Sequence, residues 1–185
     1  YSRMESLWIG KELEKLNFYW FEEPMDESSM SSYIWLSEQL EIPIIGPETM
    51  VGKMSTRAEW IKNNACDILR GGVGDLGGLT PLMKVAHLAE SYNMAMEVHG
   101  GKQGNLHALG SMRIPGEFYE RGLLHPFVDY EKPPEYLYEI VDPMDNEGFI
   151  HMPTGVGLGM KINFDYIFDN LVSAETKLKS SRRQH

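Results

Sequence analysis

Short apolar runs and amphipathic stretches alternate along the first 122 residues. The apolar runs lack the polar–apolar alternation of a strand with one solvent face, so they are typical of strands buried on both faces. Their starts recur about every 25 residues, which leaves room for one helix between each pair. The predicted strands are Phe18–Phe21, Ile42–Gly46, Cys66–Leu69, Met94–Val98 and a weaker fifth strand, Glu117–Tyr119.

Helix signals fill the intervals between these runs. Ser2 and Glu5 have the spacing of a capping box, and so do Thr56 and Glu59. Thr80-Pro81 places a capping residue before a proline at the first helical position. The predicted helices cover residues 2–16, 28–40, 56–64, 80–92 and 105–112.

Regular β/α alternation predicts a parallel sheet, either doubly wound or part of a (β/α)₈ barrel. In a barrel, the chemistry gathers where the strands end. The polar residues at these strand ends are Glu22, Glu48, Arg70, His99 and Glu120. Glu22 and Glu48 lie 26 residues apart, so neighbouring strands would present both carboxylates at one end. Two such oxygen ligands suit Mg²⁺.

The β/α rhythm stops after residue 122. Residues 123–153 are rich in proline, acidic residues and tyrosine, and Gly155–Gly159 is a glycine-rich connection before a predicted short helix at 162–172. The sequence therefore predicts a barrel portion at 1–122, a C-terminal segment at 123–172 and a polar, disordered tail at 173–185.

Composition narrows the class of protein. The chain has 185 residues, 27 of them acidic and 17 Lys or Arg, and its net charge of −10 argues against binding nucleic acid or anionic membranes. Cys66 is the only cysteine, so no internal disulfide can form, and we expect a reducing, cytoplasmic location. No apolar run is long enough for a membrane span. The start, Tyr1-Ser2-Arg3, reads as a truncation and not as a signal peptide.

A glycine-rich motif offers an alternative from another functional class. Gly72–Gly77 matches G-x-G-x-x-G between a predicted strand and a predicted helix, and Glu97 follows at a distance suited to a ribose contact. The chain could then be a dinucleotide-binding module. Against this, the motif normally follows the first strand of its domain, and here two strand–helix units come before it.

Several spaced motifs together identify a known family. The sequences Trp20-Phe21-Glu22-Glu23-Pro24, Gly46-Pro47-Glu48, Gly77-Gly78 and Glu97-Val98-His99-Gly100 resemble the enolase superfamily, and within it the mandelate racemase-like subgroup. The run from Tyr119 to Pro126, with Asp142-Pro143-Met144, is similar to sugar-acid dehydratases of the galactarate type. The resemblance covers residues 1 to 172.

The resemblance implies a (β/α)₇β barrel of which this chain holds strands four to eight. It implies Mg²⁺ held by three carboxylates, with Glu22 and Glu48 as the second and third ligands and the first expected before Tyr1. His99 matches the acid/base histidine, and Glu120 matches an acid that contacts the enediolate. The implied parent is a homo-oligomeric hydro-lyase acting on a small acid sugar. Racemisation or epimerisation is the alternative within the superfamily, and the isolated chain is expected to be inactive.

One position departs from the family pattern. An aspartate that pairs with the histidine is expected 27 residues before His99, and that position is Gly72. Asp75 lies three residues too late. The sequence therefore leaves open whether another group orients His99, and whether His99 acts as an acid and not as a base.

Overall fold

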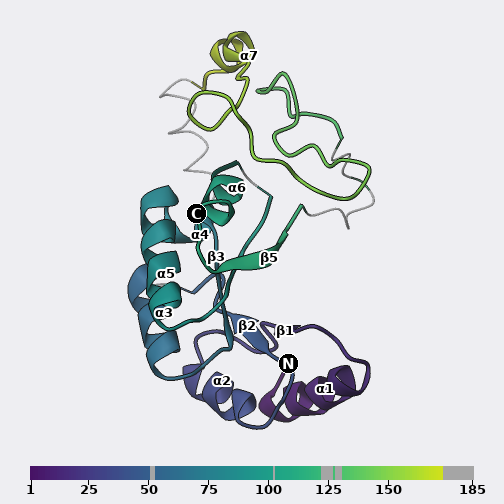
Figure 1. Ribbon diagram of the computed structural model, residues 1–185, viewed down its shortest axis with the longest axis vertical. Coiled ribbons are helices and arrows are strands. Elements are labelled where there is room, and N and C mark those ends of the chain that lie inside the picture. Colours follow the sequence, from purple (N-terminus) through teal and green to yellow (C-terminus); the bar gives the residue numbers. More distant parts are fainter. Residues whose placement is uncertain (51–52, 102, 122–126, 128–130, 173–185) are drawn as a thin grey trace. The chain divides into compact units, whose positions relative to one another are not determined.

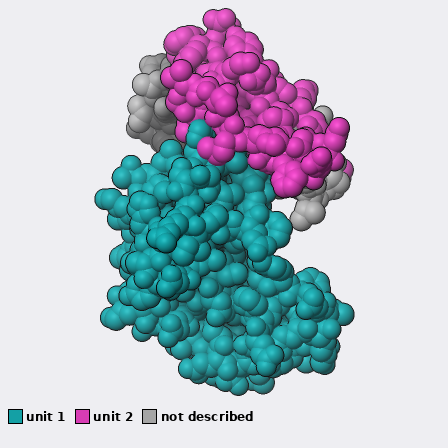
Figure 2. Space-filling model, in the orientation of Figure 1, with its two compact units in different colours: residues 1–122 teal, residues 123–185 magenta. Residues whose placement is uncertain are grey.

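The computed structural model describes residues 1–50, 53–101, 103–121, 127 and 131–172. The chain divides into two compact units, residues 1–122 and 123–185, coloured separately in Figure 2. The predicted tail at 173–185 and residues 122–126 of the dehydratase-like run lie outside the described residues.

Among the described residues, five parallel strands form one sheet in the first unit (Figure 1). The strands are β1 (Phe21–Glu22), β2 (Ile44–Gly46), β3 (Ile68–Gly71), β4 (Met96–Val98) and β5 (Pro115–Tyr119). Each strand pairs with the next along the chain; Phe21 lies opposite Ile44, and Leu69 opposite Met96. The prediction of a parallel sheet is therefore confirmed, and every strand presents its carboxyl end on the same side.

One helix, α1 (Arg3–Lys15), precedes the first strand, and helices connect each strand to the next. The connecting helices are α2 (Met30–Ser37), α3 (Lys53–Lys62), α4 (Val73–Leu76), α5 (Leu79–Ser91) and α6 (Gln103–Leu109). Figure 1 shows α2, α3 and α5 along one side of the sheet. Their buried side chains include Tyr33, Trp60 and Leu82, and the Tyr33 and Trp60 rings lie 4.6 Å apart. Each such burial stabilises the fold by about 1.5–3 kcal/mol.

The first helix begins at the predicted capping box. The Glu5 N–H donates to Ser2 Oγ at 3.4 Å, and the Ser2 N–H donates to Glu5 Oε2 at 2.8 Å. Glu14 ties the helix to the loop before β2, because its carboxylate accepts the N–H groups of Glu41 and Ile42. The helix that precedes β1 is therefore fixed at its start by local contacts and near its end by tertiary ones.

The predicted strand Phe18–Phe21 is wrong in position. The strand covers Phe21–Glu22, and Phe18 and Tyr19 are each 56% exposed. The reason lies at the end of α1, where Asn17 adopts φ 56° and the Phe18 N–H donates to the Leu13 carbonyl at 3.1 Å. This helix-terminating turn uses residues that the apolar pattern assigned to the strand.

Several predicted helix starts are also displaced. The third helix covers Lys53–Lys62 and so includes residues before Thr56; the buried guanidinium of Arg57, on this helix, donates to the Met50 and Lys53 carbonyls. The helix predicted from Thr80 begins at Leu79, after Gly78 at φ 128°. The single turn α4 was not predicted.

The second unit has little regular structure within its described part. Two isolated antiparallel bridges join Leu137 to Ile162 and Met144 to Ile150. The helix predicted at 162–172 is shorter, α7 (Phe164–Asp169), and Asn163 caps it by accepting the Tyr166 N–H at 3.1 Å. Among the described residues, no helix has the length and apolar character needed to cross a membrane.

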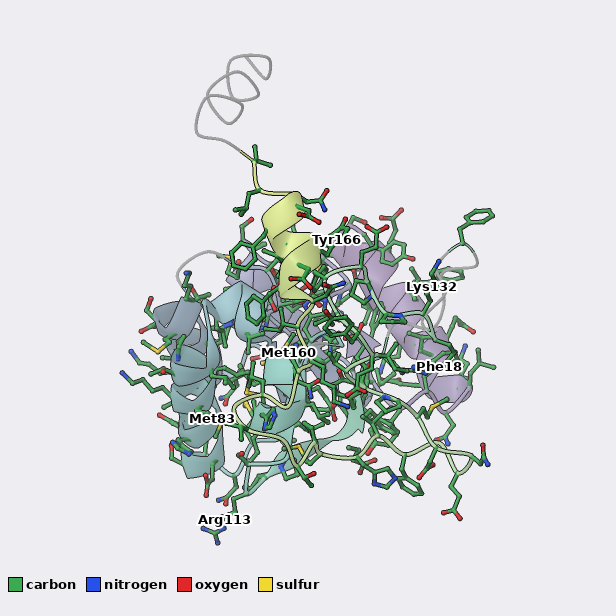
Figure 3. The ribbon with its side chains drawn as sticks, turned by 90° about the horizontal axis from the view of Figure 1, so that it is seen from above. Phe18, Met83, Arg113, Lys132, Met160 and Tyr166 are labelled. Atoms are coloured by element: carbon green, nitrogen blue, oxygen red, sulfur yellow. The ribbon has the colours of Figure 1, made fainter. Side chains whose placement is uncertain are left out.

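We predict that residues 1–185 expressed alone aggregate or pack loosely. Within the described residues, the sheet ends at β1 and β5 with no further strand paired to either. Met4 and Trp8 are exposed on α1, and Tyr1, which precedes this helix, is exposed as well. Figure 3 shows Phe18 at the outer edge of the first unit. Light scattering after gel filtration and near-UV circular dichroism measure the effect. A monodisperse monomer with a sharp cooperative melt would contradict this expectation.

Candidate active site

The side chains that follow the strand ends meet around one arginine. Arg70, on β3, is buried, and its guanidinium binds carboxylates that come from three other strand ends. Its Nη2 lies 2.8 Å from Glu22 Oε1 and 2.7 Å from Glu120 Oε2, and its Nε lies 3.1 Å from Glu48 Oε2. The structure therefore brings these four predicted site residues together.

Charge dominates this cluster. Burial alone would lower the pKa of Arg70, but the carboxylates of Glu22, Glu120 and Glu48 outweigh it and raise that pKa above its usual value. Burial also raises the pKa of Glu22, even though Arg70 opposes this change. For Glu120 the balance is reversed: burial is outweighed by the Gly100 N–H, at 2.9 Å, and by Arg70, so its pKa is lowered.

His99, the fifth predicted site residue, lies directly after β4 and between two carboxylates. Its Nε2 is 3.2 Å from Glu48 Oε1, and its Nδ1 is 3.1 Å from Asp75 Oδ2. With a carboxylate beside each ring nitrogen, the orientation of the imidazole is fixed from both sides. The His99 side chain is one-third exposed, so its Nε2, beside Glu48, lies at an accessible surface.

The structure places the Asp75 carboxylate beside the His99 imidazole. The aspartate sits on the short helix α4, and that extra turn carries its carboxylate back to the imidazole. Gly72 leaves the space for it: a Cβ at residue 72 would lie 3.0 Å from Asp75 Oδ2 and 2.6 Å from the His99 carbonyl. The expected position of the aspartate, residue 72, is a glycine. The sequence alone does not show that the turn of α4 brings the Asp75 carboxylate to His99.

Asn105 is a positioning residue that the sequence analysis missed. Its side chain is buried on α6 and donates to the His99 carbonyl at 2.6 Å and to the Gly100 carbonyl at 2.8 Å. Its Oδ1 accepts the Val73 N–H at 2.8 Å. Asn105 thus joins the turn that carries Asp75 to the loop that carries His99. A lone asparagine in a predicted helix gave no signal of this role.

The same contacts argue against the dinucleotide-binding alternative. The Val73 N–H, which a phosphate would need, already donates to Asn105, and the Leu76 and Gly77 N–H groups close the turn of α4. Glu97, the candidate ribose ligand, is buried, and its carboxylate accepts the Glu117 N–H at 2.7 Å. Its lone pairs hold β5 in place beside β4.

Glu48 lies on a loop that buried polar groups hold. The fully buried Arg57 donates to the backbone carbonyls of Pro47 and Glu48. From the other side, the Glu48 N–H donates to the carboxyl groups of Glu23 and Glu27. Burial and the adjacent Glu27 raise the pKa of Glu23 to about 9, so this pair shares one proton at neutral pH.

A cavity of about 420 Å³ lies beside the cluster. This volume is within the range of small-ligand sites. The polar part of its wall consists of Glu22, Arg70 and Glu120. The aromatic part consists of Tyr19, Trp20 and Phe118. Charged groups with one apolar wall suit a small anionic, hydroxylated ligand.

The donor set fits a divalent cation in part. Glu22 and Glu48 present carboxylate oxygens to a single positive charge, the Arg70 guanidinium, so this location already holds a cation. Hard oxygen donors of this kind suit Mg²⁺. Within the described residues, however, no group of three acidic, histidine or cysteine side chains is placed to hold a metal. These residues could supply two ligands of a set.

Parallel strands whose carboxyl ends carry acids and a histidine define a segment of a β/α-barrel with its site at the strand ends. Residues 1–166 match the family model described as enolase C-terminal domain-like. The chain therefore belongs to the enolase C-terminal domain-like family, within the enolase superfamily, and covers the C-terminal part of its barrel. The resemblance seen in the sequence is confirmed.

Similar proteins include sugar-acid dehydratases, and also cycloisomerases. A crystal structure of D-glucarate dehydratase from Agrobacterium tumefaciens, complexed with magnesium, has 53% sequence identity and a TM-score of 0.89, covering 94% of this chain and 45% of that one. Arabinonate dehydratase from Saccharolobus solfataricus is 32% identical over 120 residues, which is 62% of this chain and 32% of that protein. L-talarate/galactarate dehydratase from Salmonella typhimurium is 26% identical over 107 residues, 58% of this chain and 27% of that protein. The chain thus spans less than half the length of these relatives.

We predict that Glu23→Gln flattens the pH dependence of stability in the complete protein that contains this chain. The pKa of Glu23 is raised from 4.5 to about 9, so the folded state holds this proton more tightly than the unfolded state. The stability that this proton contributes is fully present below about pH 4.5, and it is lost as the pH rises towards about 9. Glutamine stays neutral at every pH. The melting temperature of the variant should therefore rise relative to that of wild type between pH 6 and pH 9.

The matched control is Glu38→Gln, at an exposed position that ends α2. It should track wild type across the same pH range. A constant difference between Glu23→Gln and wild type at all pH values would contradict the shared proton.

Proposed function

We propose that the complete protein is a Mg²⁺-dependent dehydratase of acid sugars. The observation that carries this proposal is the position of His99 between Asp75 and Glu48. The Glu48 carboxylate in turn shares the Arg70 guanidinium with Glu22. Membership of the family and the 53% identity to a D-glucarate dehydratase support it. D-Glucarate and galactarate are therefore the first substrates to test.

Glu22 and Glu48 would hold the metal, with a further ligand from outside this chain. Bound Mg²⁺ would bind the substrate carboxylate and stabilise the negative charge that develops when the α-proton leaves. Both glutamates belong to rigid elements, since Glu22 ends β1 and the Glu48 loop is fixed by Arg57. This rigidity keeps the two carboxylates at a constant separation.

His99 is the proposed general acid. Loss of the β-hydroxyl requires a proton, and an imidazole held by Asp75 can donate one so that the group leaves as water. The α-proton goes to a base that lies outside this chain. General acid catalysis of this kind contributes typically 10²–10⁴-fold in rate.

Glu120 is the proposed contact to the developing enediolate. The Gly100 N–H and Arg70 anchor its carboxylate, and it lines the same cavity as the aromatic side chains. Racemisation or epimerisation remains the alternative reaction, since it shares proton removal and differs only in the fate of the enediolate. An acid/base histidine can serve either reaction, and the 53% identity to a D-glucarate dehydratase favours elimination.

We predict that Glu22→Gln or Glu48→Gln in the complete protein abolishes Mg²⁺-dependent turnover of D-glucarate or galactarate. Each substitution removes a charged ligand and keeps the shape of the side chain, so the fold should persist. Release of the keto product is measured with and without EDTA, and circular dichroism checks folding. Glu23→Gln is the control and should retain turnover at neutral pH because that carboxyl already carries a proton. Full activity of both ligand variants would exclude this metal site.

We predict that His99→Asn separates two steps. Dehydration should fall by about 10²-fold or more because the hydroxyl has lost its acid. Exchange of the α-proton with solvent deuterium, followed by NMR, should persist, because a base outside this chain removes that proton. Loss of exchange together with dehydration, in a folded variant that still binds Mg²⁺, would make His99 the base.

A further inference from the structure

Arg70 contacts one oxygen of each proposed metal ligand. Glu22 Oε1 lies 2.8 Å from Nη2, and Glu48 Oε2 lies 3.1 Å from Nε. A divalent cation, which takes carboxylate oxygens at about 2.0–2.6 Å, would approach the same two carboxylates. Two cations on one pair of carboxylates repel each other, so the guanidinium and a metal ion compete for these two side chains.

The arginine is also held in this place by the fold. It comes from β3, in the middle of the described sheet, and its side chain is only 6% exposed. Its contact with Glu120, at 2.7 Å, does not involve a proposed metal ligand, so this ion pair can retain the guanidinium when the other two contacts are lost. Arg70 is thus a tethered cation and not a mobile surface charge.

We propose that Arg70 is a built-in counter-cation that competes with Mg²⁺ at Glu22 and Glu48 and thereby weakens metal binding. This inference rests on the proposed function, because it assumes that those two glutamates are metal ligands. The guanidinium neutralises these acids when metal is absent, which keeps the empty site folded. The same contact lowers the net gain when a metal ion arrives, because the metal ion must weaken or displace it.

The test is calorimetric titration of Mg²⁺ into the complete protein after EDTA treatment. Arg70→Met removes the competitor and keeps an unbranched side chain, so the Kd for Mg²⁺ should fall by roughly tenfold or more, the change that corresponds to about 1.4 kcal/mol. Arg113→Met is the matched control for net charge. Arg113 is 84% exposed, pairs only loosely with Glu90 at 3.6 Å, and projects away from the ribbon in Figure 3. Its variant should bind Mg²⁺ like wild type.

Arg70→Lys covers the case in which Arg70→Met does not fold without metal. Lysine keeps a point charge but not the planar fork that reaches several carboxylates at once. Its Kd for Mg²⁺ should be lower than that of wild type and higher than that of Arg70→Met. The rise in melting temperature on adding Mg²⁺ should follow the same order. If both Arg70 variants bind Mg²⁺ no more tightly than wild type, Arg70 is not a competitor.

The same titration on Glu48→Gln distinguishes a failure of the proposed metal site from a failure of the proposed competition by Arg70. If wild type binds Mg²⁺ and Glu48→Gln does not, the metal site stands, and the Arg70 variants alone decide the competition. If wild type shows no Mg²⁺ binding, or Glu48→Gln leaves it unchanged, the proposed metal site is wrong and the role of Arg70 is overturned with it.

Discussion

The site depends on neutralising acids that are gathered at the carboxyl ends of neighbouring strands. Parallel strands bring Glu22, Glu48 and Glu120 to one edge, where the like charges of their carboxylates repel one another. Arg70 provides one positive charge that touches all three. These ion pairs therefore matter less for their net stabilisation of the fold than because they allow neighbouring strands to carry these acids.

The parallel sheet and most strand-end residues could be predicted because both depend on local patterns. Continuous apolar runs mark buried strands, and polar residues directly after them reach the same edge in any parallel sheet. The pattern failed at Phe18 and Tyr19, where the end of α1 used apolar residues for a turn. Apolar character alone does not distinguish a strand from the residues that join it to a helix.

The supporting residues could not be predicted, because their roles depend on distant contacts. Arg57 in a helical stretch reads as a surface residue, yet it is fully buried and binds carbonyls of the Glu48 loop. Glu27 follows the strand end in a polar stretch, and only the fold places it against Glu23 and Thr49. Charged side chains are rarely buried without a partner, and the sequence does not name that partner.

The relation between Gly72 and Asp75 has a consequence for how such sequences vary. The Asp75 carboxylate fills the space next to His99 that Gly72 leaves, and a Cβ at position 72 would lie 3.0 Å from that carboxylate and 2.6 Å from the His99 carbonyl. A side chain at position 72 would therefore meet the carboxylate and the backbone of the His99 loop at once. Loss of the Asp75 carboxylate alone would not make room for it, so a substitution at position 72 also requires the backbone around His99 to shift.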